Sequence, residues 1–187
     1  MKNPANLGGD SNPVLVVVMG VSGAGKSTVS QALAEQCGYL YLDADDFHSV
    51  EARTRMAAGT PLTDDMRKPW IETICQHLRE LAANNTDVVL AFSGLRKVHR
   101  EPLRHCGYQV QFLFLDGDRE TISARMQART GHFMPSSLLD SQFACLERPD
   151  TEADVHALDI TPPLPEMLDE AVAVIKERRS RSQLTTE

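Results

Sequence analysis

The feature that most constrains this chain is a glycine-rich loop set between two regular elements. Residues 14–19, VLVVVM, form an apolar run rich in β-branched side chains, which is typical of a buried strand, and residues 20–28, GVSGAGKST, follow it directly. A helical pattern then begins. The loop fits the pattern G-x-x-x-x-G-K-S, in which backbone amides hold a phosphate chain, the lysine reaches the β- and γ-phosphates and the serine hydroxyl contacts Mg²⁺.

Physical chemistry explains why this loop needs glycines. Without a Cβ, successive backbone N–H groups can turn inward and approach a phosphate closely. The helix that follows directs the positive end of its dipole to the same place. A chance match in a surface turn is the alternative, but the preceding strand and following helix are the context that the motif requires. We therefore expect a nucleoside triphosphate to bind Gly20, Val21, Ser22, Gly23, Ala24, Gly25, Lys26, Ser27 and Thr28.

Composition indicates a soluble globular protein. The chain has 187 residues, 42% of them hydrophobic and 24% charged, which is enough for a substantial core. Its net charge of −7 argues against nucleic acid or an anionic membrane as the main partner. The longest apolar run, residues 14–19, is too short to span a bilayer. The N-terminal residues have no signal-peptide pattern, and four widely spaced cysteines favour reduced thiols, so we expect a cytoplasmic location.

The order of elements predicts the fold class. Five strand-like segments alternate with helical patterns, at 14–19, 39–42, 87–92, 108–115 and 155–160. Such alternation favours a three-layer α/β fold with a five-stranded parallel sheet covered by helices on both faces. We expect a single P-loop domain at 14–179, between a flexible leader at 1–13 and a flexible tail at 180–187. Ligands of such sheets gather at the carboxyl ends of the strands.

An acidic cluster, DADD at residues 43–46, follows the second predicted strand and should lie beside the phosphate loop. Phosphoryl transfer requires a carboxylate near Mg²⁺ and a group that orients or deprotonates the attacking hydroxyl. We assign Asp43 to Mg²⁺, through water, and Asp45 to the acceptor hydroxyl. A solvated loop, or a helix cap at Asp46, is the alternative for any one of these acids.

Two arginines four residues apart, Arg125 and Arg129, share one face of the helix predicted after the fourth strand. The helix breaks at 131–135, so the segment at about 130–143 is expected to form a small lid. Arginines carried by a lid can neutralise charge on the phosphoryl group that is transferred. A solvated basic face is the alternative.

A second basic group, which includes Arg96 and Arg100, begins the segment after the third strand. Guanidinium groups suit a carboxylate or phosphate because they can form two parallel hydrogen bonds. Arg53 is a further candidate, with Arg55 and Arg67, on the segment expected above the sheet. Two histidines flank the predicted substrate loops, although a lone histidine is more often a structural hydrogen-bonding group. They are His48 and His132.

Taken together, these motifs resemble the small gluconokinases. The resemblance covers nearly all of residues 14–175 and rests on the phosphate loop, DADDFH at 43–48, MAAGTPLTDD at 56–65, PW at 69–70 and GHFMPSSLLDSQF at 131–143. It implies a fold like that of nucleoside monophosphate kinases and shikimate kinase. It also implies phosphoryl transfer from ATP, with Mg²⁺, to the 6-hydroxyl of D-gluconate, and a homodimer.

The resemblance also assigns roles to particular residues. It implies that Arg125 lies against the adenine, that Arg129 lies near the phosphates and that Pro162 or its neighbours close the base pocket. Ser93 and Arg100 keep their places in the family pattern at the substrate. The chain departs from that pattern at two positions, where Arg96 replaces the usual lysine and His99 the usual tyrosine.

Three other functions are compatible with a phosphate loop. A kinase for another small hydroxy acid, such as shikimate, is the nearest alternative. A GTP-dependent switch would carry an N-K-x-D motif that reads guanine, and this sequence has none. A nucleotide-binding regulator without activity would have no need for Lys26, Asp45 and Arg129. We therefore expect a phosphotransferase.

Overall fold

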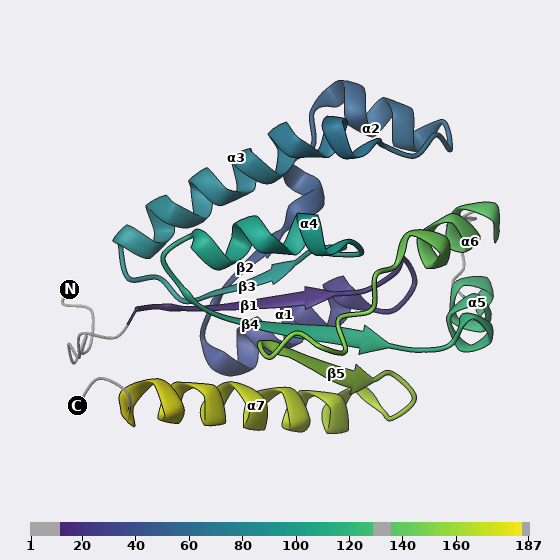
Figure 1. Ribbon diagram of the computed structural model, residues 1–187. Helices are drawn as coiled ribbons and strands as arrows, with labels where there is room; N and C mark the ends of the chain where they lie inside the picture. Colours follow the sequence, from purple (N-terminus) through teal and green to yellow (C-terminus); the bar gives the residue numbers. More distant parts are fainter. Residues whose placement is uncertain (1–11, 129–135, 185–187) are drawn as a thin grey trace.

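The chain folds into three layers, a central sheet with helices on both faces (Figure 1). The structure is a computed structural model that describes residues 12–128 and 136–184. The strands are β1 (Val14–Met19), β2 (Leu40–Asp43), β3 (Val88–Ala91), β4 (Gln109–Asp116) and β5 (Val155–Asp159). The helices are α1 (Lys26–Cys37), α2 (Val50–Ala57), α3 (Asp64–Ala83), α4 (Lys97–Arg100), α5 (Arg119–Ala128), α6 (Ser136–Cys145) and α7 (Leu164–Leu184), with 3₁₀ turns η1 (Ala44–Phe47) and η2 (Glu101–His105).

The sheet has the order β2-β3-β1-β4-β5, and every pairing is parallel. This confirms the predicted fold class. β1 lies at the centre, with Val16 opposite Val89 of β3 on one side and opposite Gln111 of β4 on the other. All six of its residues are buried. The continuous apolar run in the sequence is therefore explained by burial of both faces of β1.

Alternate side chains of β1 point to two separate cores. The first core includes Val16 and Val18 and is covered by α1 and α7, while the second includes Leu15 and Val17 and is covered by α3 and η2. Because a strand exposes successive side chains to opposite faces, one short segment anchors both layers of helices. The phosphate loop therefore begins at the end of a strand whose six residues are all buried.

Two helices extend further than local sequence signals alone suggest. Pro69 lies inside α3, and α3 nevertheless runs without a break from Asp64 to Ala83. A proline removes only one helical hydrogen bond, and this end is held by the Thr63 cap and by Trp70 Nε1, which donates to Ala44 O at 2.7 Å. At the other terminus, α7 continues past residue 179 to Leu184.

The carboxyl ends of the strands lie at one end of the molecule. In Figure 1 the arrowheads of β1, β4 and β5 point toward the end where α5 and α6 lie, and α2 projects above the same end. Segments that are far apart in the sequence therefore meet around the phosphate loop. Among the residues described, we find no helix with the length and apolar character needed to cross a membrane.

Candidate active site

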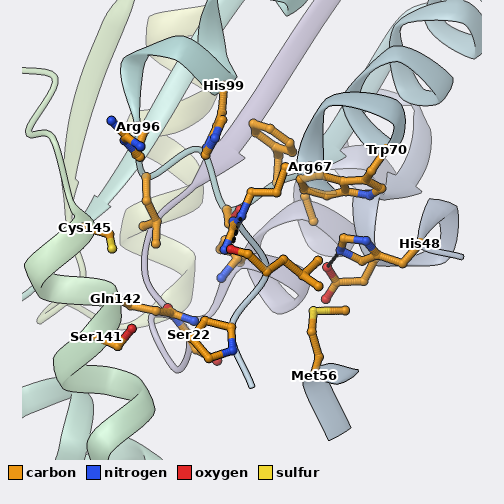
Figure 2. Close-up of a pocket in the computed structure, with 18 of the residues that line it drawn as sticks. Ser22, His48, Met56, Arg67, Trp70, Arg96, His99, Ser141, Gln142 and Cys145 are labelled. Carbon is orange, nitrogen blue, oxygen red and sulfur yellow. Dashed lines mark hydrogen bonds and ion pairs between the residues drawn. The ribbon is translucent and has the colours of Figure 1, made fainter. Parts of the chain in front are cut away.

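A pocket of about 600 Å³ opens at the carboxyl ends of β1, β2 and β3. Figure 2 shows its walls, with His48 and Trp70 on one side and Ser141 and Gln142 of α6 on the other. The polar side chains that line it include those of Lys26, Ser27, Asp43, Asp45, His48, Asp64, Arg67, Ser93, Arg96, His99, Ser141 and Gln142. The donor loop and the predicted acceptor residues therefore share one cavity.

The phosphate loop has the backbone conformation that its glycines predict. Gly20, Gly23 and Gly25 have φ angles of 146°, 84° and 104°, in the region that disfavours side chains. The Gly20 amide donates to the carbonyl of Ser93 at 3.1 Å, which ties the loop to the segment after β3. Lys26 Nζ donates to a loop carbonyl, Val21 O, at 3.1 Å.

Asp43 is held in place by three donors. Ser27 Oγ donates to one carboxylate oxygen at 3.3 Å and Tyr41 Oη donates to the same oxygen at 3.0 Å. The amide of Asp45 donates to the other oxygen at 3.0 Å, in a cap that begins η1. A hydroxyl and a carboxylate therefore lie side by side where the phosphate loop meets β2. Oxygen donors of these types are those that Mg²⁺ prefers.

Asp45 projects into the open pocket, where 84% of its side chain is exposed. Its pKa is raised, first by partial desolvation and then by the negative charge of Asp43, while His48 and Lys26 oppose the shift. Solvent screening limits the effect at so exposed a group. A raised pKa makes a carboxylate a better proton acceptor, and Asp45 lines the cavity beside the phosphate loop.

A stack of rings forms the wall beside Asp45. His48 lies on Trp70 with ring centroids 4.2 Å apart and an interplanar angle of 13°, and Trp70 lies on Phe92 at 5.2 Å. Burial lowers the pKa of His48, which keeps its imidazole neutral near pH 7. Its Nε2 is 3.7 Å from Asp45 Oδ1. Arg53 supports this wall from outside, because it donates to the carbonyl of His48 at 3.0 Å and does not line the pocket.

Asp64, the first residue of α3, lies between two basic side chains from the α4 region. Arg96 Nη1 pairs with one of its oxygens, and His99 Nε2 is 3.0 Å from the other. Arg96 Nε also lies 3.2 Å from Glu147 Oε1. Desolvation raises the pKa of Asp64, but the charges and hydrogen bonds of Arg96 and His99 together outweigh it, and the net pKa is lowered. Arg96 thus lines the pocket with its guanidinium already shared between two carboxylates.

Arg67 offers more donors to a ligand. It lies one turn further along α3, and its Nε donates to Leu62 O at 3.4 Å. Within the described residues, no protein acceptor contacts its terminal nitrogens. Burial lowers the pKa of the guanidinium, yet arginine keeps its charge in proteins. A partly desolvated cation with free donors is well suited to bind an anion.

Arg100 lies behind the pocket and not in its wall. Only 1% of the residue is exposed, and its guanidinium forms an ion pair with Glu152. It also donates to Gly94 O at 2.6 Å and to Glu147 O at 3.2 Å. The structure therefore brings Arg96 to the predicted substrate site but leaves Arg100, like Arg53, outside it. Arg100 instead links the loop after β3 to the segment that follows α6.

The residues predicted near the adenine lie beside β5. Arg125 donates from Nη2 to the carbonyl of Ile160, two residues before Pro162, which is half-buried. Neither residue lines the pocket. Arg129 and His132 lie outside the described residues, as do residues 130–135 of the predicted lid. Their roles stay predictions.

Two residues of the pocket wall, His99 and Gln142, were not assigned a role from the sequence. His99 was noted only as a departure from the family pattern, because a lone histidine in a basic segment carries no signal of its own. Gln142 was only part of the family motif at 131–143. Arg67 was a secondary candidate, although its place one turn after the Thr63 cap puts it on a defined face of α3.

The fold and the pocket define a P-loop phosphotransferase of the small-kinase class. A model of the AAA domain family matches residues 15–149. The thermosensitive gluconokinase of Escherichia coli (strain K12) is 40% identical over 167 residues, which cover 87% of this chain and 89% of that protein. A gluconokinase of Arabidopsis thaliana is 42% identical over 74% of this chain and 80% of its own. The crystal structure of a gluconokinase from Sinorhizobium meliloti 1021, 39% identical, superposes with a TM-score of 0.85 over 95% of this chain and 99% of that one. The chain therefore belongs to the gluconokinase family.

Replacement of Arg100 should test its structural role. We expect Arg100→Met to lower the free energy of unfolding by about 3 kcal/mol, because Glu152 would stay buried with only Arg104 as partner. Arg119→Met is the matched control, since Arg119 and Asp140 form an exposed pair that contributes less than about 1 kcal/mol. Urea unfolding measures both values. An equal loss of unfolding free energy in the two variants would show that the Arg100–Glu152 ion pair stabilises the fold no more than an exposed pair does.

Proposed function

We propose that this chain transfers the γ-phosphoryl group of ATP to the 6-hydroxyl of D-gluconate and releases 6-phospho-D-gluconate and ADP. The observation that carries the proposal is one cavity that joins a complete phosphate loop to a carboxylate, Asp45, and to an arginine with donors to spare, Arg67. Family membership supports the same donor and acceptor. We call the pocket side chains from η1, α3, the segment before α4 and α6 the acceptor wall. A nucleotide-dependent switch has no use for such a wall.

The donor side holds ATP by its phosphates. Amides at the start of α1 and the ammonium of Lys26 neutralise the phosphate chain, for which Lys26 exchanges its contact with Val21 O for the phosphates. Ser27 and Asp43 would hold Mg²⁺, which when bound screens the charge of the phosphates. The fit rests on the 3.3 Å contact between the Ser27 hydroxyl and the Asp43 carboxylate. Magnesium usually keeps several waters and few protein ligands, so two oxygen donors suffice.

The acceptor side positions the hydroxyl for in-line attack. Asp45 accepts the hydrogen bond from the 6-hydroxyl and receives its proton as the new P–O bond forms. The bond between the γ-phosphorus and the bridging oxygen breaks, and its electron pair leaves with ADP. Most of the rate enhancement comes from positioning and electrostatics, because the protein forms no covalent bond.

The acid group of the substrate needs a cation, and Arg67 is the better candidate. Arg96 is shared between Asp64 and Glu147, so its donors are largely occupied. Within the part of the chain that the structure describes, no acceptor contacts the terminal nitrogens of Arg67, and a guanidinium binds a carboxylate through two parallel bonds. His48 and Ser93 line the same cavity and can contact the hydroxyl groups of the sugar acid.

Further features implied by the family resemblance stay predictions. They include the contacts of Arg125 and Pro162 with adenine, the charge stabilisation by Arg129, the contact of His132 with substrate, the cytoplasmic location and the homodimer. Sedimentation equilibrium of the purified protein tests the last of these. A mass of 20.7 kDa would indicate a monomer, and twice that mass a dimer.

An ADP-release assay tests the proposed function directly. Purified protein, ATP and Mg²⁺ are mixed with D-gluconate, with its epimers or with shikimate, and ADP is measured by a coupled reaction. We expect the highest kcat/KM with D-gluconate. The proposal is wrong if another hydroxy acid is preferred, or if ATP binds and no acid releases ADP.

The role of Asp45 predicts a large loss of turnover without loss of binding. Asp45→Asn keeps the shape of the side chain but cannot take the proton, so kcat for gluconate should fall by about 10²- to 10⁴-fold. Asp46→Asn, an exposed neighbour that does not line the pocket, is the control and should retain kcat. A nearly unchanged kcat in a folded Asp45→Asn protein would refute the assignment.

The role of Arg67 predicts a loss specific to the acid substrate. Arg67→Met should lower kcat/KM for gluconate by about 10- to 100-fold, which corresponds to the loss of a hydrogen bond to a charged group. The KM for ATP should not change. Arg55→Met, on an exposed position of α2, controls for the loss of a positive charge. A larger effect on ATP than on gluconate would place Arg67 on the donor side instead.

A further inference from the structure

One side chain of α6 contacts the phosphate loop directly. The amide of Ser22 donates to Oε1 of Gln142 at 2.6 Å, a contact between residues 120 positions apart in the sequence. Gln142 is half-buried and lines the pocket (Figure 2). The contact therefore joins the phosphate loop to the wall of the cavity that α6 forms.

The direction of this hydrogen bond fixes the orientation of the glutamine amide. Because the backbone nitrogen of Ser22 is a donor, the atom that faces it must be the carbonyl oxygen, and Nε2 must point elsewhere. Nε2 carries two N–H donors, and within the described residues no protein acceptor contacts them. Gln142 thus brings two unused donors to a cavity that is built to bind phosphate.

Packing holds Gln142 in this position. Leu139 of the same helix is 2% exposed and belongs to the core under α1, and Phe143 packs against that core. Arg119 of α5 donates to Asp140 of α6 at 2.6 Å, which joins the two helices. The glutamine is therefore presented by a supported helix and not by a loose loop, which favours a functional role that needs fixed geometry.

Bound nucleotide need not displace the glutamine. The amides that hold phosphates cluster at the N-terminus of α1, where Gly25 is the N-cap. Ser22 lies three residues before that cap, so its amide can stay with Gln142 while phosphates fill the helix end. The γ-phosphoryl group is the end of the triphosphate farthest from the adenosine. It would then be the phosphate nearest to the Nε2 donors of Gln142.

We propose that Gln142 is a catalytic residue that hydrogen-bonds through Nε2 to the phosphoryl group during transfer, while its Oε1 stays on the Ser22 amide. The proposal rests on the proposed kinase function. As the bond to the bridging oxygen breaks and the bond to the acceptor oxygen forms, charge spreads over the three other oxygens of the phosphoryl group. A donor fixed beforehand at one of them stabilises this charge, and Gln142 itself gains or loses no proton.

Two substitutions test whether Gln142 acts in catalysis or only holds α6 against the phosphate loop. Gln142→Met keeps the length of the side chain but removes both hydrogen-bonding functions, and Gln142→Glu keeps the acceptor for Ser22 while replacing the donors with a negative oxygen. We expect kcat for gluconate to fall by about 100-fold or more in both variants, with little change in the KM for ATP. Gln127→Met, at an exposed position of α5, is the control and should retain kcat.

Ligand binding provides a second measurement, which would not change selectively if Gln142 only held α6 against the phosphate loop. Trp70, the only tryptophan of the chain, lies in the pocket wall and reports binding by its fluorescence. Gln142→Met should bind ADP·Mg²⁺ as wild type does. It should bind ADP·Mg²⁺ with aluminium fluoride and gluconate, a mimic of the transferring phosphoryl group, about 100-fold more weakly, because only this mimic carries the developing charge.

The outcomes are separable from those of the proposed function. Wild-type turnover of gluconate is measured first, and its absence would refute the kinase function alone. If wild type is active, an unchanged kcat in Gln142→Met overturns the proposal. So does equal weakening of ADP and of the aluminium fluoride complex, which would indicate that Gln142 only docks α6.

Discussion

The hydrogen bond from the Gly20 amide to the Ser93 carbonyl joins the two halves of the site. It ties the beginning of the phosphate loop, at the end of β1, to the segment that follows β3. The next carbonyl along that segment, of Gly94, accepts from the buried Arg100. A donor loop and an acceptor wall that meet at one backbone contact can keep a fixed distance, and phosphoryl transfer depends mainly on such positioning. The buried β1 strand supplies the rigidity behind this contact.

The arginines around this contact differ in how many of their donors are occupied by protein partners. Arg100 is buried with Glu152 and backbone carbonyls, so it supports the wall from behind. Arg67 lines the cavity, and no acceptor among the described residues contacts its terminal nitrogens, so these donors can bind an anionic ligand. Arg96 is intermediate, since it lines the cavity while paired with Asp64. A fully buried cation such as Arg100 needs protein partners, and these partners occupy its donors. The arginines that can bind substrate are therefore those that stay partly exposed.

The sequence alone predicted the sheet, the phosphate loop and the acids after β2, because each depends on residues that are close in the chain. It could not separate Arg96 from Arg100, which are four residues apart and look equivalent on a regular helix. In the structure Arg96 precedes α4 with φ −111°, and only Arg100 lies within the helix, so they point to different sides. Their partners, Glu147 and Glu152, are about fifty residues away and leave no local pattern.

Separation along the sequence also distinguishes the donor half of the site from the acceptor half. The phosphate loop is a single segment of nine residues whose backbone does most of the binding, so a short motif identifies it. The acceptor wall combines side chains from η1, α3, the segment before α4 and α6, and each is placed by contacts across the fold. A substitution in this wall, at His99 for example, can therefore alter the acceptor side of the pocket without changing the loop. Specificity for the acid substrate can change in this wall while the use of ATP is preserved.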